Sequence, residues 1–121
     1  MQTLAAIAKS FVYATRGIVK VFQEERNFRI QAWTGAAVVV LMFTLDLSVS
    51  EKALLSLAIA FVLVLELLNS VLERVVDILK PRIHHYVEDV KDMMAGAVLV
   101  ASVAAAFIGF LVFWPHLFPS V

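Results

Sequence analysis

From Met93 to Trp114 the chain carries no charged side chain, and a helix of that length matches the ~30 Å hydrocarbon core of a bilayer. Two further apolar stretches precede it, one over about residues 30–48 and one over about residues 53–79. A soluble domain of 121 residues could not bury all three, since 62% of this chain is hydrophobic and its mean hydropathy is +0.91. We therefore expect a single-domain, all-α membrane protein over residues 1–121, with three spans at about 30–48, 53–79 and 93–114.

Residues 4–26 predict an amphipathic helix ahead of the first span. Apolar side chains recur at helical spacing on one side, and the other side carries Lys9, Tyr13, Arg16 and Lys20. A basic amphipathic helix of this kind commonly lies in the headgroup plane of a membrane. A helix packed on its own protein would show the same pattern. We favour the surface helix because a membrane span follows at once, and we expect no cleaved signal peptide because Lys9 interrupts the apolar start.

Polar segments and prolines divide the rest of the chain. A short turn follows the first span, Pro81 is expected to end the second helix, and His84–Asp92 is expected to be a polar connection. Pro115 closes the third span. The basic residues cluster before the first span and in the second connection, so the positive-inside rule places the N-terminus and that connection in the cytoplasm. The expected location is the cytoplasmic membrane, spanned several times.

Composition excludes several classes of function. The chain has no cysteine, which rules out disulfides, thiolate metal sites and cysteine nucleophiles. Its net charge is zero, so no nucleic-acid partner is expected. No phosphate-binding loop of a standard nucleotide-binding fold is present.

The informative segment is the polar stripe, which we define as Glu66, Asn69, Ser70, Glu73 and Asp77. At 100° per residue these side chains fall within one arc of a helix, and apolar residues occupy the rest. Lipid cannot solvate such a stripe, so it is expected to face protein or a water-filled cleft. Glu66 follows a long apolar run and is expected inside the cytoplasmic half of the bilayer, with Glu73 about 10 Å nearer the cytoplasm.

Other charged residues are expected at the same surface. They are Glu24 and Glu25 before the first span, Arg82 and His84 in the second connection, and Lys91 and Asp92 at the start of the third span. Carboxylates that hold a cation, a lysine for phosphate and one deeper carboxylate suit phosphoryl transfer, which needs metal, positioning and a base. Plainer interpretations also exist: Asp77 as the solvated end of a long helix, and Lys91–Asp92 as an interfacial anchor.

The polar stripe also resembles a known signature. The run from Glu66 to Asp77 is similar to the motif E-x-x-N-S/T-x-x-E-x-x-x-D of the prokaryotic diacylglycerol kinase family. The likeness continues in order through Tyr13-Ala-Thr-Arg-Gly, Glu25-Arg-Asn-Phe-Arg and Lys91-Asp, with Ala-Gly-Ala-Val beyond. It covers nearly the whole chain. Val71 departs from the motif, which usually has a small residue there, one that would allow close packing.

The resemblance implies a homotrimer of three-span subunits that phosphorylates lipid alcohols with ATP and Mg²⁺, with sites shared between subunits. Carried over by position, Glu66 would be the catalytic base and Asn69 would help to hold the lipid hydroxyl. Glu25 and Glu73 would hold magnesium on the nucleotide. The residues implied around the nucleotide phosphates are Lys91, Asp92, Tyr13 and His84. Where the first span enters the membrane, Arg29 and Gln31 would meet the lipid.

The substrate is the finer question. Gln31 stands where diacylglycerol-specific members carry a glutamate, and the run Glu25–Phe28 is similar to the branch that phosphorylates undecaprenol. We expect undecaprenol, with diacylglycerol as the alternative. Two rivals from other classes are a small proton-coupled transporter, which would place its acid nearer the midplane, and a non-catalytic membrane subunit, which would tolerate Glu66→Gln.

Overall fold

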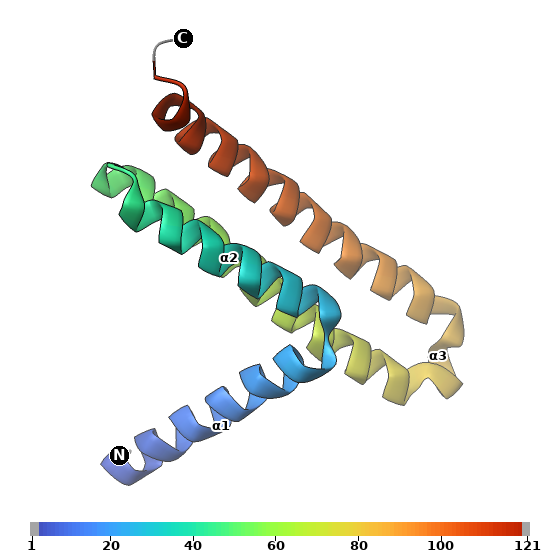
Figure 1. Ribbon diagram of the computed structural model, residues 1–121. Helices are drawn as coiled ribbons and strands as arrows, with labels where there is room; N and C mark the ends of the chain where they lie inside the picture. The colour runs from blue at the N-terminus through green and yellow to red at the C-terminus, as the bar shows by residue number, and fades with distance from the viewer. Residues whose placement is uncertain (1–2, 120–121) are drawn as a thin grey trace.

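The part of the chain that the structure describes is all-helical, as the sequence predicts, and consists of three helices. The computed structural model describes residues 3–119, except for the side chains of residues 80–85. The helices are α1 (Leu4–Glu24), α2 (Arg26–Thr44) and α3 (Val49–Leu117). Helix α3 folds back on itself, and α1 projects away from the other helices (Figure 1).

Helix α1 agrees with the predicted amphipathic helix over residues 4–26. The Thr3 hydroxyl caps its first turn by accepting the Ala6 N–H at 3.2 Å. Much of its apolar side is uncovered: Leu4 is 86% exposed and Phe11 is 70% exposed. An apolar helix face left uncovered by the rest of the chain fits a helix that rests on a membrane surface.

A single residue, Glu25, separates α1 from α2. Its backbone is extended, with φ −108° and ψ 112°, and the chain changes direction there (Figure 1). Edge-on packing of Phe22 against Trp33, with ring centroids 6.3 Å apart, joins the two helices beside the junction. The position of Glu25 is therefore set by the ends of two helices.

Helix α2 packs along the first part of α3. The two are joined by a short turn after Leu45, and α3 then starts with a capping box in which Ser48 and Glu51 exchange hydrogen bonds of 3.1 and 2.9 Å. Close approach needs a small residue at Gly35, since a Cβ there would lie 2.9 Å from Ile59 Cγ2. At this end of the molecule a core of apolar side chains is buried: Met42, Leu47, Leu55 and Val112.

Helix α3 differs from the prediction between its two membrane segments. The helical assignment passes Pro81 and includes residues 86–92, so the expected helix end at Pro81 and the expected connection up to Asp92 are wrong. A proline removes one backbone donor and can bend a helix without ending it. Helix α3 bends sharply in its yellow part, and we call the parts on either side the first arm (Val49–Leu79) and the second arm (Tyr86–Leu117) (Figure 1).

Side-chain contacts hold the second arm against the rest of the chain at three levels. Lys91 pairs with Asp77 near the bend, Gln31 of α2 reaches Ser102 midway, and His116 contacts Glu51 at 3.2 Å at the far end. The two arms therefore run side by side in opposite directions.

Both arms are long and apolar enough to cross a membrane, with mean hydropathies of 2.3 and 2.5. Only 22% and 11% of their most apolar windows are buried, whereas the core helix of a soluble protein would be mostly buried. Among the described residues α2 does not meet the same criterion; it is long enough, at 19 residues, but its first turn carries Arg26 and Arg29, which lower its mean hydropathy. The structure and composition thus support a membrane protein with two candidate spans.

Candidate active site

The polar stripe lies on the first arm and runs from the interior of the molecule to its surface. Glu66 and Ser70 are buried, at 5% and 3% exposure. Asn69 and Glu73 are half-buried, and Asp77 is exposed. The predicted gradient from a deep acid to a solvated end is therefore present in the folded chain.

The other side of the same helix is apolar and uncovered. Leu68, Val71 and Val75 are 51%, 55% and 45% exposed. In water a helix exposes its charged side chains and buries its apolar ones, whereas this helix does the reverse. Its polar face therefore suits contact with protein, and its apolar face suits contact with lipid or with another subunit. The observation agrees with the expectation that the stripe faces protein.

Two carboxylates, one of them from a distant part of the sequence, lie near Glu66. Glu25, half-buried at the α1–α2 junction, and Glu73, two turns along the first arm, both lie near enough to repel the Glu66 carboxylate electrostatically. A positive charge beside these carboxylates would offset their repulsion, so a bound cation would stabilise the arrangement. The fold thus brings together the residues that the resemblance assigns to the base and the metal.

We next compare Glu25, Glu66 and Glu73 with the ligands that a protein magnesium site requires. Among residues 3–79 and 86–119, no group of three or more histidine, aspartate or glutamate side chains is arranged as a ready metal cage. Magnesium in phosphoryl-transfer sites usually takes one or two protein carboxylates and completes its shell with phosphate oxygens and water. Glu25 and Glu73 fit a metal that arrives on a nucleotide.

Lys91 approaches the same cluster from the second arm. Its Nζ lies 2.8 Å from Asp77 Oδ1, and Glu73 and Glu88 also attract it electrostatically. Its side chain is 28% exposed. The ammonium is therefore fixed at the wet end of the polar stripe, where a phosphate group could reach it, and the neighbouring Asp92 is exposed there.

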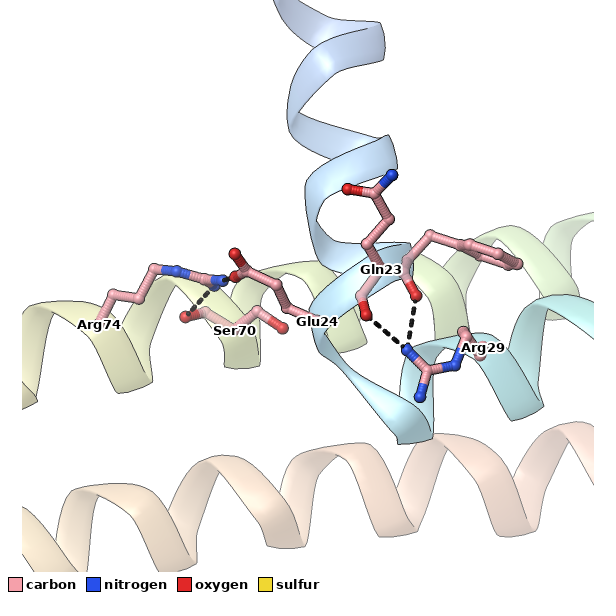
Figure 2. A network of polar contacts seen from close by, with 6 residues as sticks. Gln23, Glu24, Arg29, Ser70 and Arg74 are labelled. Atoms are coloured by element: carbon pink, nitrogen blue, oxygen red, sulfur yellow. Dashed lines mark hydrogen bonds and ion pairs between the residues drawn. The ribbon is translucent and has the colours of Figure 1, made fainter.

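Two arginines hold the junction that carries Glu25, and Figure 2 shows both. Arg74 of the first arm pairs with Glu24, the last residue of α1, and donates to the Ser70 carbonyl at 3.1 Å. Arg29 of α2 donates to the carbonyls of Phe22 and Gln23 at 2.9 and 2.8 Å. Those carbonyls belong to the last turn of α1, where no helical partner satisfies them.

The contacts of Arg29 and Arg74 are not predicted by the sequence pattern. Arg29 was expected to meet the lipid, and the structure places its guanidinium on α1, so its contact with a lipid stays a prediction. Arg74 was assigned no site role at all. The one available signal was its place inside the polar segment, directly after Glu73.

An apolar groove of about 390 Å³ opens between α2 and the two arms of α3. Gln31 lines it and donates to Ser102 Oγ at 3.4 Å, a long hydrogen bond. Val62, one turn from Glu66, lines it as well, and small residues occupy much of the wall: Gly35, Ala58, Ala105, Ala106 and Gly109. The groove therefore leads from the level of the deep acid into the apolar part of the molecule.

Two predicted nucleotide-binding residues remain, Tyr13 and His84. Tyr13 is 61% exposed on the projecting helix α1, where the Arg16 guanidinium carbon lies 5.6 Å from its ring centroid. His84 lies outside the described side chains. Their predicted roles remain untested.

Comparisons with known proteins point the same way. A family model described as prokaryotic diacylglycerol kinase matches residues 12–113. The undecaprenol kinase of Bacillus subtilis is 40% identical over 109 residues, which cover 90% of this chain and 89% of that protein. A diacylglycerol kinase of Synechocystis sp. is 41% identical over 89% of this chain and 62% of its own length. The diacylglycerol kinase of Escherichia coli K12 is 30% identical over 91% of this chain and 90% of its own length.

Proposed function

Because this chain belongs to the prokaryotic diacylglycerol kinase family, it is a lipid kinase, and we propose that it transfers the terminal phosphoryl group of ATP to undecaprenol at the cytoplasmic face of the membrane. The observation that carries the proposal is the buried carboxylate of Glu66 inside an apolar helix, flanked by Glu25 and Glu73. Family membership also argues against the transporter and the non-catalytic subunit as alternatives.

Glu66 is the proposed general base. It would accept the proton of the lipid hydroxyl while that oxygen forms a bond to the terminal phosphorus. The bond from this phosphorus to the bridging oxygen breaks at the same time, and ADP leaves. Asn69, on the same helix face and half-buried, would hold the hydroxyl toward Glu66.

Glu25 and Glu73 are the proposed ligands of a magnesium ion carried by the nucleotide, an ion that neutralises charge on the phosphates when bound. Lys91, fixed by Asp77, would contact the phosphates from the second arm. Tyr13, His84 and Asp92 complete the proposed nucleotide surroundings. Because Tyr13 is distant on α1, it would serve a site to which a neighbouring subunit contributes.

The groove beside Gln31 is the proposed place for the lipid tail. It is apolar and begins near the level of Glu66, so an isoprenoid chain could lie in it with its hydroxyl at the acid. Gln31 and, at the membrane surface, Arg29 would meet the head of the lipid. Two relatives of nearly equal identity carry different substrate names, so identity alone does not choose between undecaprenol and diacylglycerol.

The finer architecture belongs to the same proposal. We propose that α2 and both arms of α3 cross the cytoplasmic membrane, that α1 lies on its inner surface, and that three copies associate. The uncovered valines and leucines of the first arm and the exposed apolar side of α1 support this arrangement.

Incubation of the purified protein in micelles with labelled ATP, Mg²⁺ and either undecaprenol or diacylglycerol tests the proposal. We expect label in undecaprenyl phosphate at a higher kcat/KM than in phosphatidic acid. Activity on diacylglycerol alone would replace the substrate and keep the lipid kinase. Labelling of neither lipid, under conditions in which the protein is folded, would overturn the proposed reaction.

A further inference from the structure

Arg74 links two elements that each carry one of the proposed metal ligands. Its guanidinium pairs with Glu24 of α1, and its bond to the Ser70 carbonyl fixes it on the first arm (Figure 2). Glu24 directly precedes Glu25, and Arg74 directly follows Glu73. The ion pair therefore joins the chain immediately beside both carboxylates, although they are far apart in sequence.

The ion pair is too exposed to matter much for stability. Its two side chains are 41% and 49% exposed, and pairs of this kind typically contribute little to the free energy of unfolding. What it can supply is position. Glu25 is the single extended residue between two helices, so its carboxylate moves whenever the end of α1 moves relative to the first arm.

The ion pair between Arg74 and Glu24 also has an electrostatic effect on the carboxylate cluster. Glu25 and Glu73 each already repel Glu66, and Glu24 would add a further negative charge beside Glu25. The guanidinium of Arg74 offsets the charge of Glu24 and opposes the separation of α1 from the first arm. Arg29 assists from α2, since its two bonds to the last turn of α1 hold the other side of the junction.

We propose that Arg74, acting through Glu24, is a positioning residue that holds Glu25 beside Glu73 so that the two carboxylates can bind one nucleotide-borne divalent cation. The inference rests on the proposed function for the identity of that cation site. It adds the element that assembles the site, which is an ion pair between α1 and the first arm.

Binding of Mn²⁺ measures this directly and needs no phosphoryl transfer. Electron paramagnetic resonance would follow Mn²⁺ binding in the presence of a non-hydrolysable ATP analogue, for the full-length protein in micelles. We expect Arg74→Gln and Glu24→Gln each to weaken Mn²⁺ binding roughly tenfold, and to do so non-additively when combined. Lys9→Gln, which removes one positive charge from the exposed face of α1, is the matched control and should bind like the wild type.

Rescue separates positioning from a merely structural role. The exchanged pair Glu24→Arg/Arg74→Glu should restore most of the Mn²⁺ affinity. Arg74→Lys keeps the positive charge at this position, so it should lose less Mn²⁺ affinity than Arg74→Gln. In activity assays the half-maximal Mg²⁺ concentration should rise in Arg74→Gln while the KM for the lipid stays the same.

The outcomes are distinct. Wild-type Mn²⁺ affinity in both Arg74→Gln and Glu24→Gln would overturn the inference, even if both variants melted at a lower temperature. Failure of the wild-type protein to phosphorylate either lipid would count against the proposed function, whereas the Mn²⁺ titrations would still decide whether Arg74 and Glu24 assemble a cation site.

Discussion

Glu66 is a carboxylate at 5% exposure on a helix whose far side carries exposed valines, and this combination gives it its proposed role. Glu66→Gln keeps the volume and removes the base, so we expect turnover to fall at least ~10²-fold with folding retained. The rate is measured with labelled ATP, and folding by circular dichroism. Glu51→Gln, the same change in the first turn of α3 and away from the carboxylate cluster, should keep the rate. Near-normal turnover in Glu66→Gln would remove Glu66 as the base.

Gln31 provides the residue-level test of substrate choice. It lines the groove near the level of Glu66, where a glutamate could accept a hydrogen bond from a second hydroxyl or a polar head. A glutamine is uncharged and costs less to hold beside a head with one hydroxyl. Gln31→Glu should therefore shift the ratio of kcat/KM values toward diacylglycerol.

The control for that change is Ser102→Ala, which removes the hydrogen-bond partner of Gln31 without adding charge. It should leave the substrate ratio close to that of the wild type. If Ser102→Ala and Gln31→Glu shift the ratio equally, the shape of the groove and not the charge at residue 31 governs selection.

At the scale of elements, the site requires the α1–α2 junction to lie against the first arm, because Glu25 belongs to the junction and Glu73 to the first arm. If they share one cation, Glu25→Gln and Glu73→Gln should each raise the Mg²⁺ concentration needed for half-maximal rate. The double variant should then lose less than the two single losses combined. The additive control combines Glu73→Gln with Glu51→Gln, a residue in the first turn of α3. Independent losses for Glu25 and Glu73 would argue for separate sites.

The packing of α2 on the first arm offers a stability test at Gly35. Alanine there gains helix propensity of up to ~1 kcal/mol but places a Cβ 2.9 Å from the Cγ2 of Ile59, a β-branched and stiff side chain. Overpacking of this kind costs about 1–3 kcal/mol. Gly35→Ala should therefore lower the Tm, whereas Gly109→Ala, whose Cβ would meet nothing within 4 Å, should leave it equal or higher. A lower Tm in Gly109→Ala alone would contradict this packing.

The polar stripe could be predicted from sequence, because polar side chains on a helix in lipid must share the face that contacts protein. Its burial gradient from Glu66 to Asp77 then followed from rise per residue. The pairing of Arg74 with Glu24 could not be predicted, since nothing in local spacing says which surface charges meet across such a separation. The sequence predicts that Pro81 ends a helix, but α3 continues past it, because the hydrogen bond lost at a proline is local.

At the scale of the whole molecule, the charged candidate site lies at one end, and a separate polar contact joins the two arms at the other end. The cluster of Glu25, Glu66, Glu73 and Lys91 lies toward the bend of α3, whereas the contact between His116 and Glu51 lies at the opposite end. If the arms cross a bilayer, only one of these ends can face cytoplasmic ATP. The positive-inside rule assigns the bend to that side.

Single cysteines test this orientation cleanly, because the chain has none of its own. Ser50, exposed in the first turn of α3, and Asp89, exposed in the second arm beyond the bend, lie near opposite ends of the molecule. In intact cells an impermeant thiol reagent should label Ser50→Cys and leave Asp89→Cys unreacted until the membrane is opened. Labelling of Asp89→Cys alone in intact cells would reverse the orientation. It would also separate the carboxylate cluster from its proposed nucleotide, so that the lipid kinase reaction would need a phosphoryl donor outside the cytoplasm.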